Sequence, residues 1–231
     1  MQRRKFTSGV VSFGGLGALS LLNEAQSASL SEGDATLGVR AALERGAVAA
    51  VGLLGKSGGF LDNPKVRIPL PGFLNDAAQL LRLTGQQKRV DELVTAMNRA
   101  AEAAVPEAKA LLVSAVKAMS VSDATQLISG GDNSVTKFFA DKTRAPLGVK
   151  FLPIVTKATE KVSLAEKYNR VAGKAAGVGL VKKEDANVQQ YVTGKALDGL
   201  YLMIGEEERK IRKDPIGTGS AILGKVFGSL K

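Results

Sequence analysis

The chain has 231 residues, of which 45% are hydrophobic and 5% aromatic, and its formal net charge is +10. It contains no histidine, cysteine or tryptophan, which excludes Ser-His-Asp triads, cysteine nucleophiles, disulfides and metal sites built from His or Cys. Carboxylate sites for hard cations and acid–base chemistry by Asp, Glu, Lys or Tyr remain open. The basic residues are scattered and few aromatic residues could stack on bases, so we expect no nucleic-acid partner, and no cofactor is predicted.

The N-terminus has the order of an export signal. Arg3 and Arg4 precede an uncharged, mostly apolar run at 9–22, and small polar residues follow at 23–28. The apolar run is shorter than the roughly 20 residues that a membrane-spanning helix needs. The paired arginines resemble a twin-arginine signal, but Thr7 replaces an apolar residue usual in that motif, so the general secretory route stays open.

We therefore predict a cleavable signal peptide over residues 1–28 and a single helical domain over residues 29–231. Cleavage would remove three basic residues and one acidic residue, leaving a net charge of +8. No later apolar stretch reaches membrane length, so we expect a periplasmic protein without a transmembrane segment. The alternative is a basic amphipathic N-terminal helix that stays attached.

The rest of the chain is predicted to be helical apart from one loop. Ser31 or Asp34 is expected to begin a helix that ends at Leu54, before Gly55. Residues 56–72 hold three prolines and two adjacent glycines, which favour an extended crossing loop with one short strand around 66–68.

Further helices are expected in chain order, several of them bounded by a capping residue, Gly or Pro. The predicted ranges are 73–83, 87–105, 108–119, 123–128 after a Ser122 cap, 135–142 after Asn133 or Ser134, a segment at 144–159 that Pro146 and Pro153 kink or break, 164–176, a long helix from Asp185 or Asn187 to about Arg212, and 218–227. This pattern predicts an all-α fold, a single-domain multi-helix bundle with one irregular Pro/Gly-rich crossing loop.

Two strings imitate phosphate-binding loops. Residues 219–225 fit the spacing G-x-x-x-x-G-K, but Val226 stands where the magnesium-binding Ser or Thr belongs. Gly55-Lys56-Ser57 has the right ending, but Ala50 replaces the first glycine and a helix precedes it. We interpret both as coincidences. Residues 130–133 could present backbone N–H groups to an anion, but we favour a plain turn there.

Polar side chains at helical spacing form the candidate sites. Asn98 and Glu102 lie one turn apart with Arg99 beside them, so they frame either a polar site or an internal structural network. Tyr191 and Lys195 share another face with Asp198, at positions i, i+4 and i+7.

Acidic residues followed by basic ones form a third cluster. Its order can be explained by helix stabilisation, and the alternative is a carboxylate metal site that includes Asp198. The members of the cluster are Glu206, Glu207, Glu208, Arg209, Lys210, Arg212 and Lys213. We include Glu207, Arg209 and Arg212 among the candidate site residues, and we assign no catalytic residue and no metal ligand.

Several strings, in one order, resemble a family of exported bacterial proteins known as domain of unknown function 4197. They lie at 30–34, 68–71, 97–102, 123–124 with 130–131, 151–155, 191–200, 207–215 and 226–228. The resemblance covers nearly all of the chain after the signal, and it implies an exported helical protein of Gram-negative bacteria. It carries no activity over. Many such envelope proteins are lipoproteins, but this chain lacks the cysteine that would carry a lipid.

Three functional hypotheses follow. The first is a non-enzymatic periplasmic protein that binds an apolar or anionic envelope ligand, with a lipid or an envelope protein as its partner. The second is a carboxylate-based hydrolase or lyase, with or without a metal ion, which needs Asn98, Glu102, Tyr191, Asp198 and Glu207 to converge. The third is a self-associating structural protein, in which Gly173 and Gly177 would allow close helix contact.

Overall fold

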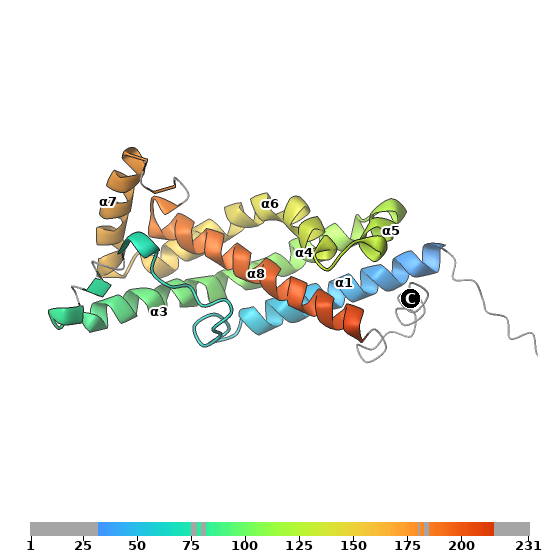
Figure 1. Cartoon of the computed structure of the whole chain (residues 1–231), viewed down its shortest axis with the longest axis horizontal. Coiled ribbons are helices and arrows are strands. Elements are labelled where there is room, and N and C mark those ends of the chain that lie inside the picture. The colour runs from blue at the N-terminus through green and yellow to red at the C-terminus, as the bar shows by residue number, and fades with distance from the viewer. Residues whose placement is uncertain (1–31, 75–77, 80–81, 180, 183–184, 215–231) are drawn as a thin grey trace, which may run out of the picture.

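Two long helices, α6 (Ser134–Thr159) and α8 (Val188–Lys213), pack along each other through the middle of the molecule (Figure 1). The computed structural model describes residues 32–74, 78–79, 82–179, 181–182 and 185–214. These residues contain helices and no strand, so the predicted all-α fold is confirmed.

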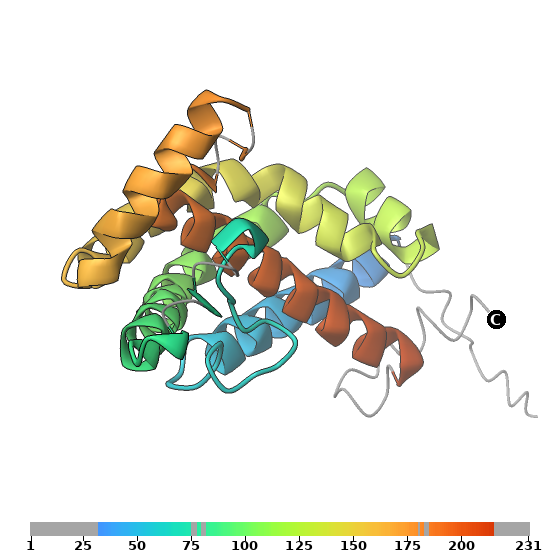
Figure 2. The same cartoon turned by 60° about the vertical axis from the view of Figure 1, so that its left-hand side comes forward.

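Shorter helices surround the central pair. Their order along the chain is α1 (Glu32–Leu54), the 3₁₀ turn η1 (Gly72–Leu74), α3 (Gln87–Ala104), the 3₁₀ turn η2 (Val105–Glu107), α4 (Ala108–Lys117), α5 (Val121–Ser129) and, between α6 and α8, α7 (Ser163–Gly177). Helix α8 also packs against α1 and α3, while α7 stands across one end of the bundle (Figures 1 and 2).

The core is aliphatic with a few phenylalanines, as the composition predicts. Phe60, Phe139 and Phe151 are fully buried together with leucines, isoleucine and methionine from every long helix except α7. Helix α7 contributes Ala165, Tyr168 and Ala172 at its inner face. Because one buried cluster joins all these elements, the helices share a single core.

The predicted crossing loop exists, but its predicted strand does not. Residues 55–71, which we call the crossing loop, run beside α8 and lie against α3 (Figure 2). The backbone turns on itself, with the amides of Val66 and Arg67 both donating to Asn63 O at 3.1 and 2.9 Å. Among the described residues no second strand pairs with Ile68, and its backbone groups bond instead to the side chain of Asn98 on α3.

Two helix boundaries differ from the prediction. Ser120, not Ser122, caps α5, because its hydroxyl accepts from the Asp123 amide at 3.0 Å while the Asp123 carboxylate accepts from the Ser120 amide at 2.8 Å. The expected break between 142 and 144 is also wrong, since α6 runs without interruption to Thr159. Pro146 and Pro153 are both exposed, so the carbonyls that lose an N–H partner face water.

Several expectations fall on residues outside the described part of the chain. These are the signal peptide at 1–28, the helix at 218–227 with its G-x-x-x-x-G-K string, and residues 75–77 and 80–81 of the segment at 73–83. Across the described ranges, no single helix has the length and hydrophobicity to cross a membrane. One bent pair, Gln87–Lys117 with Val121–Ser129, reaches that threshold only when its two arms are taken together, and these meet at 103°.

Candidate functional site

The Asn98 side chain acts as a structural bridge to the crossing loop. It is fully buried on α3, where its Oδ1 accepts from the Ile68 amide at 2.8 Å and its Nδ2 donates to Ile68 O at 2.9 Å. Nδ2 also donates to Val94 O, one turn earlier, at 2.8 Å. Both ends of the amide are therefore used, which leaves no free group for a ligand.

Glu102 holds the other half of the same loop. Its Oε1 accepts from the amides of Phe60 and Leu61, each at 3.0 Å, and its Oε2 accepts from Arg99 at 2.6 Å. Burial by itself would raise the pKa of this carboxyl, but the Leu61 amide, Arg99 and the Phe60 amide together outweigh it and lower the pKa below 4.5. Arg99 also donates to Ser57 Oγ at 2.8 Å, so Ser57, Arg99 and Glu102 form a hydrogen-bonded network within the protein.

The acidic–basic cluster at the end of α8 is likewise occupied by structural contacts. Glu207 pairs with Lys210 at 2.6 Å, and Arg209 pairs with Glu206 at 3.1 Å. These pairs are partly exposed, and each contributes at most about 1 kcal/mol to folding.

Glu208 is different, because its buried carboxylate replaces a side-chain cap at the start of α6. It accepts from the amides of Val135 and Thr136, each at 3.3 Å, and pairs with Arg212 at 2.9 Å. Asn133, the residue before α6, makes no capping bond. The N–H groups just beyond the turn at 130–133 do meet an anion, and the chain itself supplies it.

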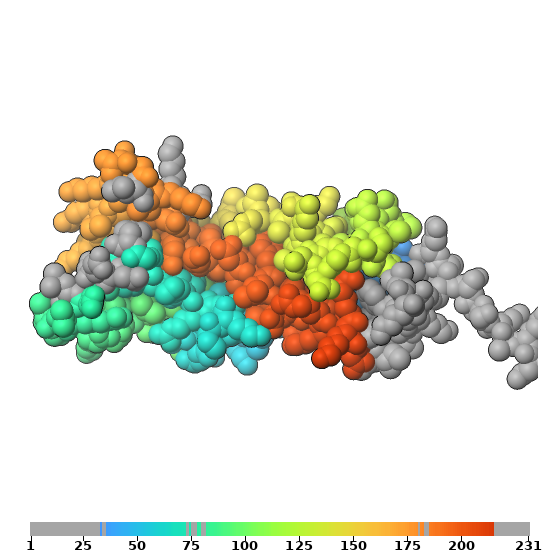
Figure 3. Space-filling model, in the orientation of Figure 1, coloured from blue at the N-terminus to red at the C-terminus, as the bar shows by residue number. Residues whose placement is uncertain are grey.

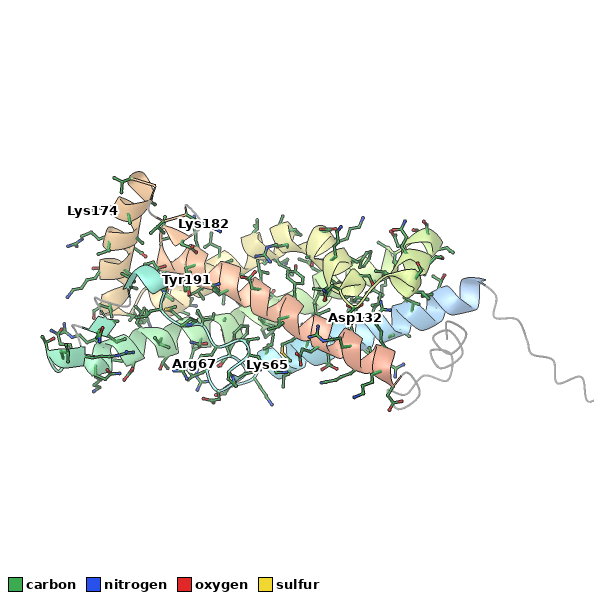
Figure 4. The ribbon with its side chains drawn as sticks, in the orientation of Figure 1. Lys65, Arg67, Asp132, Lys174, Lys182 and Tyr191 are labelled. Carbon is green, nitrogen blue, oxygen red and sulfur yellow. The ribbon has the colours of Figure 1, made fainter. Side chains whose placement is uncertain are left out.

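Tyr191, Lys195 and Asp198 line a groove. Two hollows of about 670 and 510 Å³ lie along the first half of α8 and share these three residues and Asp185. We call them the α6–α8 hollow and the loop–α8 hollow, after the elements that form their walls. In Figure 4, Tyr191 lies between Lys182, beside the first hollow, and the crossing loop, beside the second.

Each hollow has a distinct wall. Arg144, Gly148 and Leu152 of α6 face the first, together with Lys182. Residues 65–71 of the crossing loop, including Lys65 and Arg67, face the second hollow together with Gly72 of η1 and Leu202 of α8. Figure 3 shows the loop and α8 side by side at this surface.

The groove is basic. Five of its lining residues are cationic and two are acidic: Lys65, Arg67, Arg144, Lys182 and Lys195 against Asp185 and Asp198. Arg144 donates to Asp198 at 2.7 Å and Lys195 lies 4.0 Å from the same carboxylate, but all three side chains are about half exposed. Exposed pairs of this kind are weak, at most about 1 kcal/mol, so the groove retains an excess of positive charge that a ligand can meet.

Tyr191 is fixed as a hydrogen-bond donor. Its hydroxyl donates to Pro69 O at 3.0 Å, which ties α8 to the crossing loop. Burial, followed by the nearby Asp185 charge, raises its pKa to about 12. Lys195 Nζ lies 5.8 Å from the ring centroid, within cation–π range. Tyr191 therefore shapes the groove and stays protonated, so it is a poor general base.

Small residues keep the α6–α8 hollow open. Ala145 and Gly148 stand on α6, and Gly194 stands on α8. A Cβ at Gly194 would meet no atom within 4 Å, and one at Gly148 would meet only Leu197, at 4.0 Å. Larger side chains at these positions would therefore occupy the hollow.

The predicted site residues do not converge. Asn98, Arg99 and Glu102 serve the crossing loop, whereas Glu207, Arg209 and Arg212 lie about 14 to 21 Å along α8 from Asp198. In the part of the chain that the structure describes, no three acidic side chains gather closely enough to hold a metal ion. The convergence that a carboxylate hydrolase or lyase needs is not present among these residues.

Sequence reasoning missed the α6 wall and Thr193. Arg144, Gly148 and Leu152 were predicted only to be parts of a kinked helix. No sequence motif around Thr193 marked it as a site residue. No local signal marks them, because they meet α8 only after the chain has folded back. The Gly173–Gly177 stripe lies on α7, where both glycines are exposed, and its role in self-association stays a prediction.

The chain belongs to a family of helical proteins whose function is not defined. The profile described as "Protein of unknown function (DUF4197)" matches residues 29–228, which confirms the resemblance seen in the sequence. No curated protein and no solved structure gives a significant match.

Proposed function

We propose that this protein is an exported, non-enzymatic binding protein that holds an anionic ligand with an apolar portion in the groove along α8. The observation that carries the proposal is the groove itself, which combines hollows of about 670 and 510 Å³ with five cations and two acids. Volumes of this size are typical of small-molecule sites, which lie between about 300 and 1,000 Å³.

The lining supports a ligand with two characters. Leu152 and Leu197 provide apolar contact in the α6–α8 hollow, and Ile68, Leu70 and Leu202 do so in the loop–α8 hollow. The cations stand beside these apolar surfaces rather than apart from them. An amphiphilic anion from the cell envelope has the matching arrangement, and the signal-like N-terminus and the net positive charge support that setting.

Binding is favoured over catalysis because two of the acid–base groups in the groove, those of Asp198 and Tyr191, already have partners. The Asp198 carboxylate is paired with Arg144, and the Tyr191 hydroxyl is committed to Pro69. Neither group stands ready to accept a proton from a substrate.

A fluorescent apolar anion, 1-anilinonaphthalene-8-sulfonate, tests the proposal. We expect saturable one-to-one binding to the purified full-length chain, weakened roughly tenfold or more in the double variant Arg144→Gln/Lys195→Gln. The matched control is Lys109→Gln/Lys174→Gln, which removes the same charge from exposed positions that do not line the groove. Equal loss in both double variants, or binding that never saturates, would refute the proposed function.

A further inference from the structure

Thr193 carries a buried hydroxyl without a partner. The residue is 8% exposed and lines the α6–α8 hollow, and its Oγ1 makes no hydrogen bond to any described group. Three threonines of α6 bond to the carbonyl one turn earlier: Thr143 to Phe139 at 2.6 Å, Thr156 to Leu152 at 2.8 Å and Thr159 to Val155 at 2.8 Å. A buried unpaired hydroxyl is costly, and this one has almost no accessible surface of its own. Rotation about the Cα–Cβ bond would turn it toward an acceptor in the hollow that the residue lines.

Asp198 occupies the place of a counter-ion at the mouth of the same hollow. Its carboxylate accepts from Arg144 across the space between α6 and α8 and lies near Lys195. Both cations are half exposed, so their contacts with Asp198 are readily exchanged. An incoming oxyanion would take over the same donors, and Asp198 would turn outward to water.

The donor set favours phosphate over carboxylate. The α6–α8 hollow is lined by three cations, Arg144, Lys182 and Lys195, and by Thr193, against the two carboxylates of Asp185 and Asp198. A carboxylate offers two oxygens and one charge, whereas a phosphate monoester offers three oxygens and nearly two charges. The phosphate therefore satisfies more of these donors, and the remaining volume accommodates its organic part.

We propose that the α6–α8 hollow binds the phosphate group of an organic phosphate monoester, with Thr193 as a donor and Asp198 as the counter-ion that the phosphate displaces. This inference rests on the proposed function and specifies its ligand. The phosphate can come from a free metabolite or from a lipid headgroup, since both present the same group.

Calorimetry on the full-length chain tests the inference with hexyl phosphate and with heptanoate as a matched carboxylate. We expect hexyl phosphate to bind roughly tenfold more tightly than heptanoate. Vesicles of phosphatidylcholine with and without phosphatidic acid identify the source. Binding of hexyl phosphate without binding to the phosphatidic acid vesicles assigns a free ester, and binding to both assigns a headgroup.

Three variants complete the test, and two of them should change the affinity for hexyl phosphate in opposite directions. Thr193→Val should weaken hexyl phosphate binding roughly fivefold to tenfold while raising the melting temperature, because the unpaired hydroxyl is removed. Thr193→Ser should keep the affinity. Asp198→Asn should strengthen binding roughly threefold or more, since a competing anion is lost.

The failures are distinguishable. If the fluorescent anion binds in the groove but heptanoate equals or exceeds hexyl phosphate, or if Thr193→Val and Asp198→Asn both leave the affinity unchanged, the phosphate inference is wrong and the proposed function stands. If neither the fluorescent anion nor hexyl phosphate binds, both are wrong.

Discussion

The side-chain amide of Asn98 hydrogen-bonds to both backbone groups of Ile68: it accepts from Ile68 N at 2.8 Å and donates to Ile68 O at 2.9 Å. A neighbouring β-strand would make the same pair of bonds. The two residues are 30 positions apart, and both are buried. One side chain thus satisfies both backbone groups of a loop residue that has no strand partner among the described residues.

Asn98→Asp should destabilise the protein by about 2 to 4 kcal/mol. The substitution keeps the size of the side chain but replaces the Nδ2 donor by an oxygen that faces the carbonyls of Ile68 and Val94. Urea unfolding followed by circular dichroism measures the change. Gln126→Glu, the same chemical change at an exposed position, should have little effect, and equal losses in the two variants would contradict the bridge.

Acid should weaken the attachment of the crossing loop through Glu102. Its pKa is lower in the folded chain than the usual 4.5, so its contribution to stability is complete above pH 4.5 and is lost as the pH falls through the folded value. Unfolding free energies measured between pH 3 and 7 should fall on the acid side.

Glu102→Gln should reduce stability at pH 7 by about 1 to 2 kcal/mol and make the acid dependence shallower, because the neutral amide cannot lose a charge. Glu107→Gln, at an exposed position, is the control. If the unfolding free energy falls equally steeply with decreasing pH in Glu102→Gln and in the unmodified chain, the effect comes from other carboxylates.

Replacing Glu207 and replacing its neighbour Glu208 should cost very different amounts of folding stability. Glu208→Ala should cost about 3 kcal/mol or more, since it removes the acceptor at the start of α6 and leaves the partly buried Arg212 without its carboxylate. Glu207→Ala removes a pair whose lysine is 61% exposed and should cost less than about 1 kcal/mol. Thermal unfolding of both variants makes the comparison, and similar melting temperatures would refute the cap.

Gly199 lets the crossing loop lie directly on α8. A Cβ at this position would stand 2.7 Å from Phe60 Cε1 and 3.3 Å from Val66 Cβ, and Phe60 is fully buried. We expect Gly199→Ala to destabilise the chain by about 1 to 3 kcal/mol through overpacking. Gly52→Ala on α1, where a Cβ meets nothing within 4 Å, should instead stabilise by about 0.5 to 1 kcal/mol. Equal shifts in chemical denaturation would show that Phe60 can move aside.

Much of the fold is predictable because helix signals are local. The start of α8 after Asn187 and its end at Asp214 follow from a capping residue and a proline, both readable within a few positions. The interior of α6 was not predictable in the same way. Whether a proline breaks a helix depends on whether it lies on the face of the helix that is exposed to water. In α6, that face is set by packing against α8.

The amino-acid sequence by itself determined the all-α class, the aliphatic core, the order of the helices and the candidate polar faces, since each depends on composition or short-range spacing. Only the tertiary structure decided what those faces do. It turned Asn98 and Glu102 inward to hold a loop and used Glu208 to cap a helix that begins 74 positions earlier. It also brought Arg144 across from α6 to complete a groove with Lys195 and Asp198. The physical reason is that burial and charge pairing depend on neighbours in space, which no local spacing encodes.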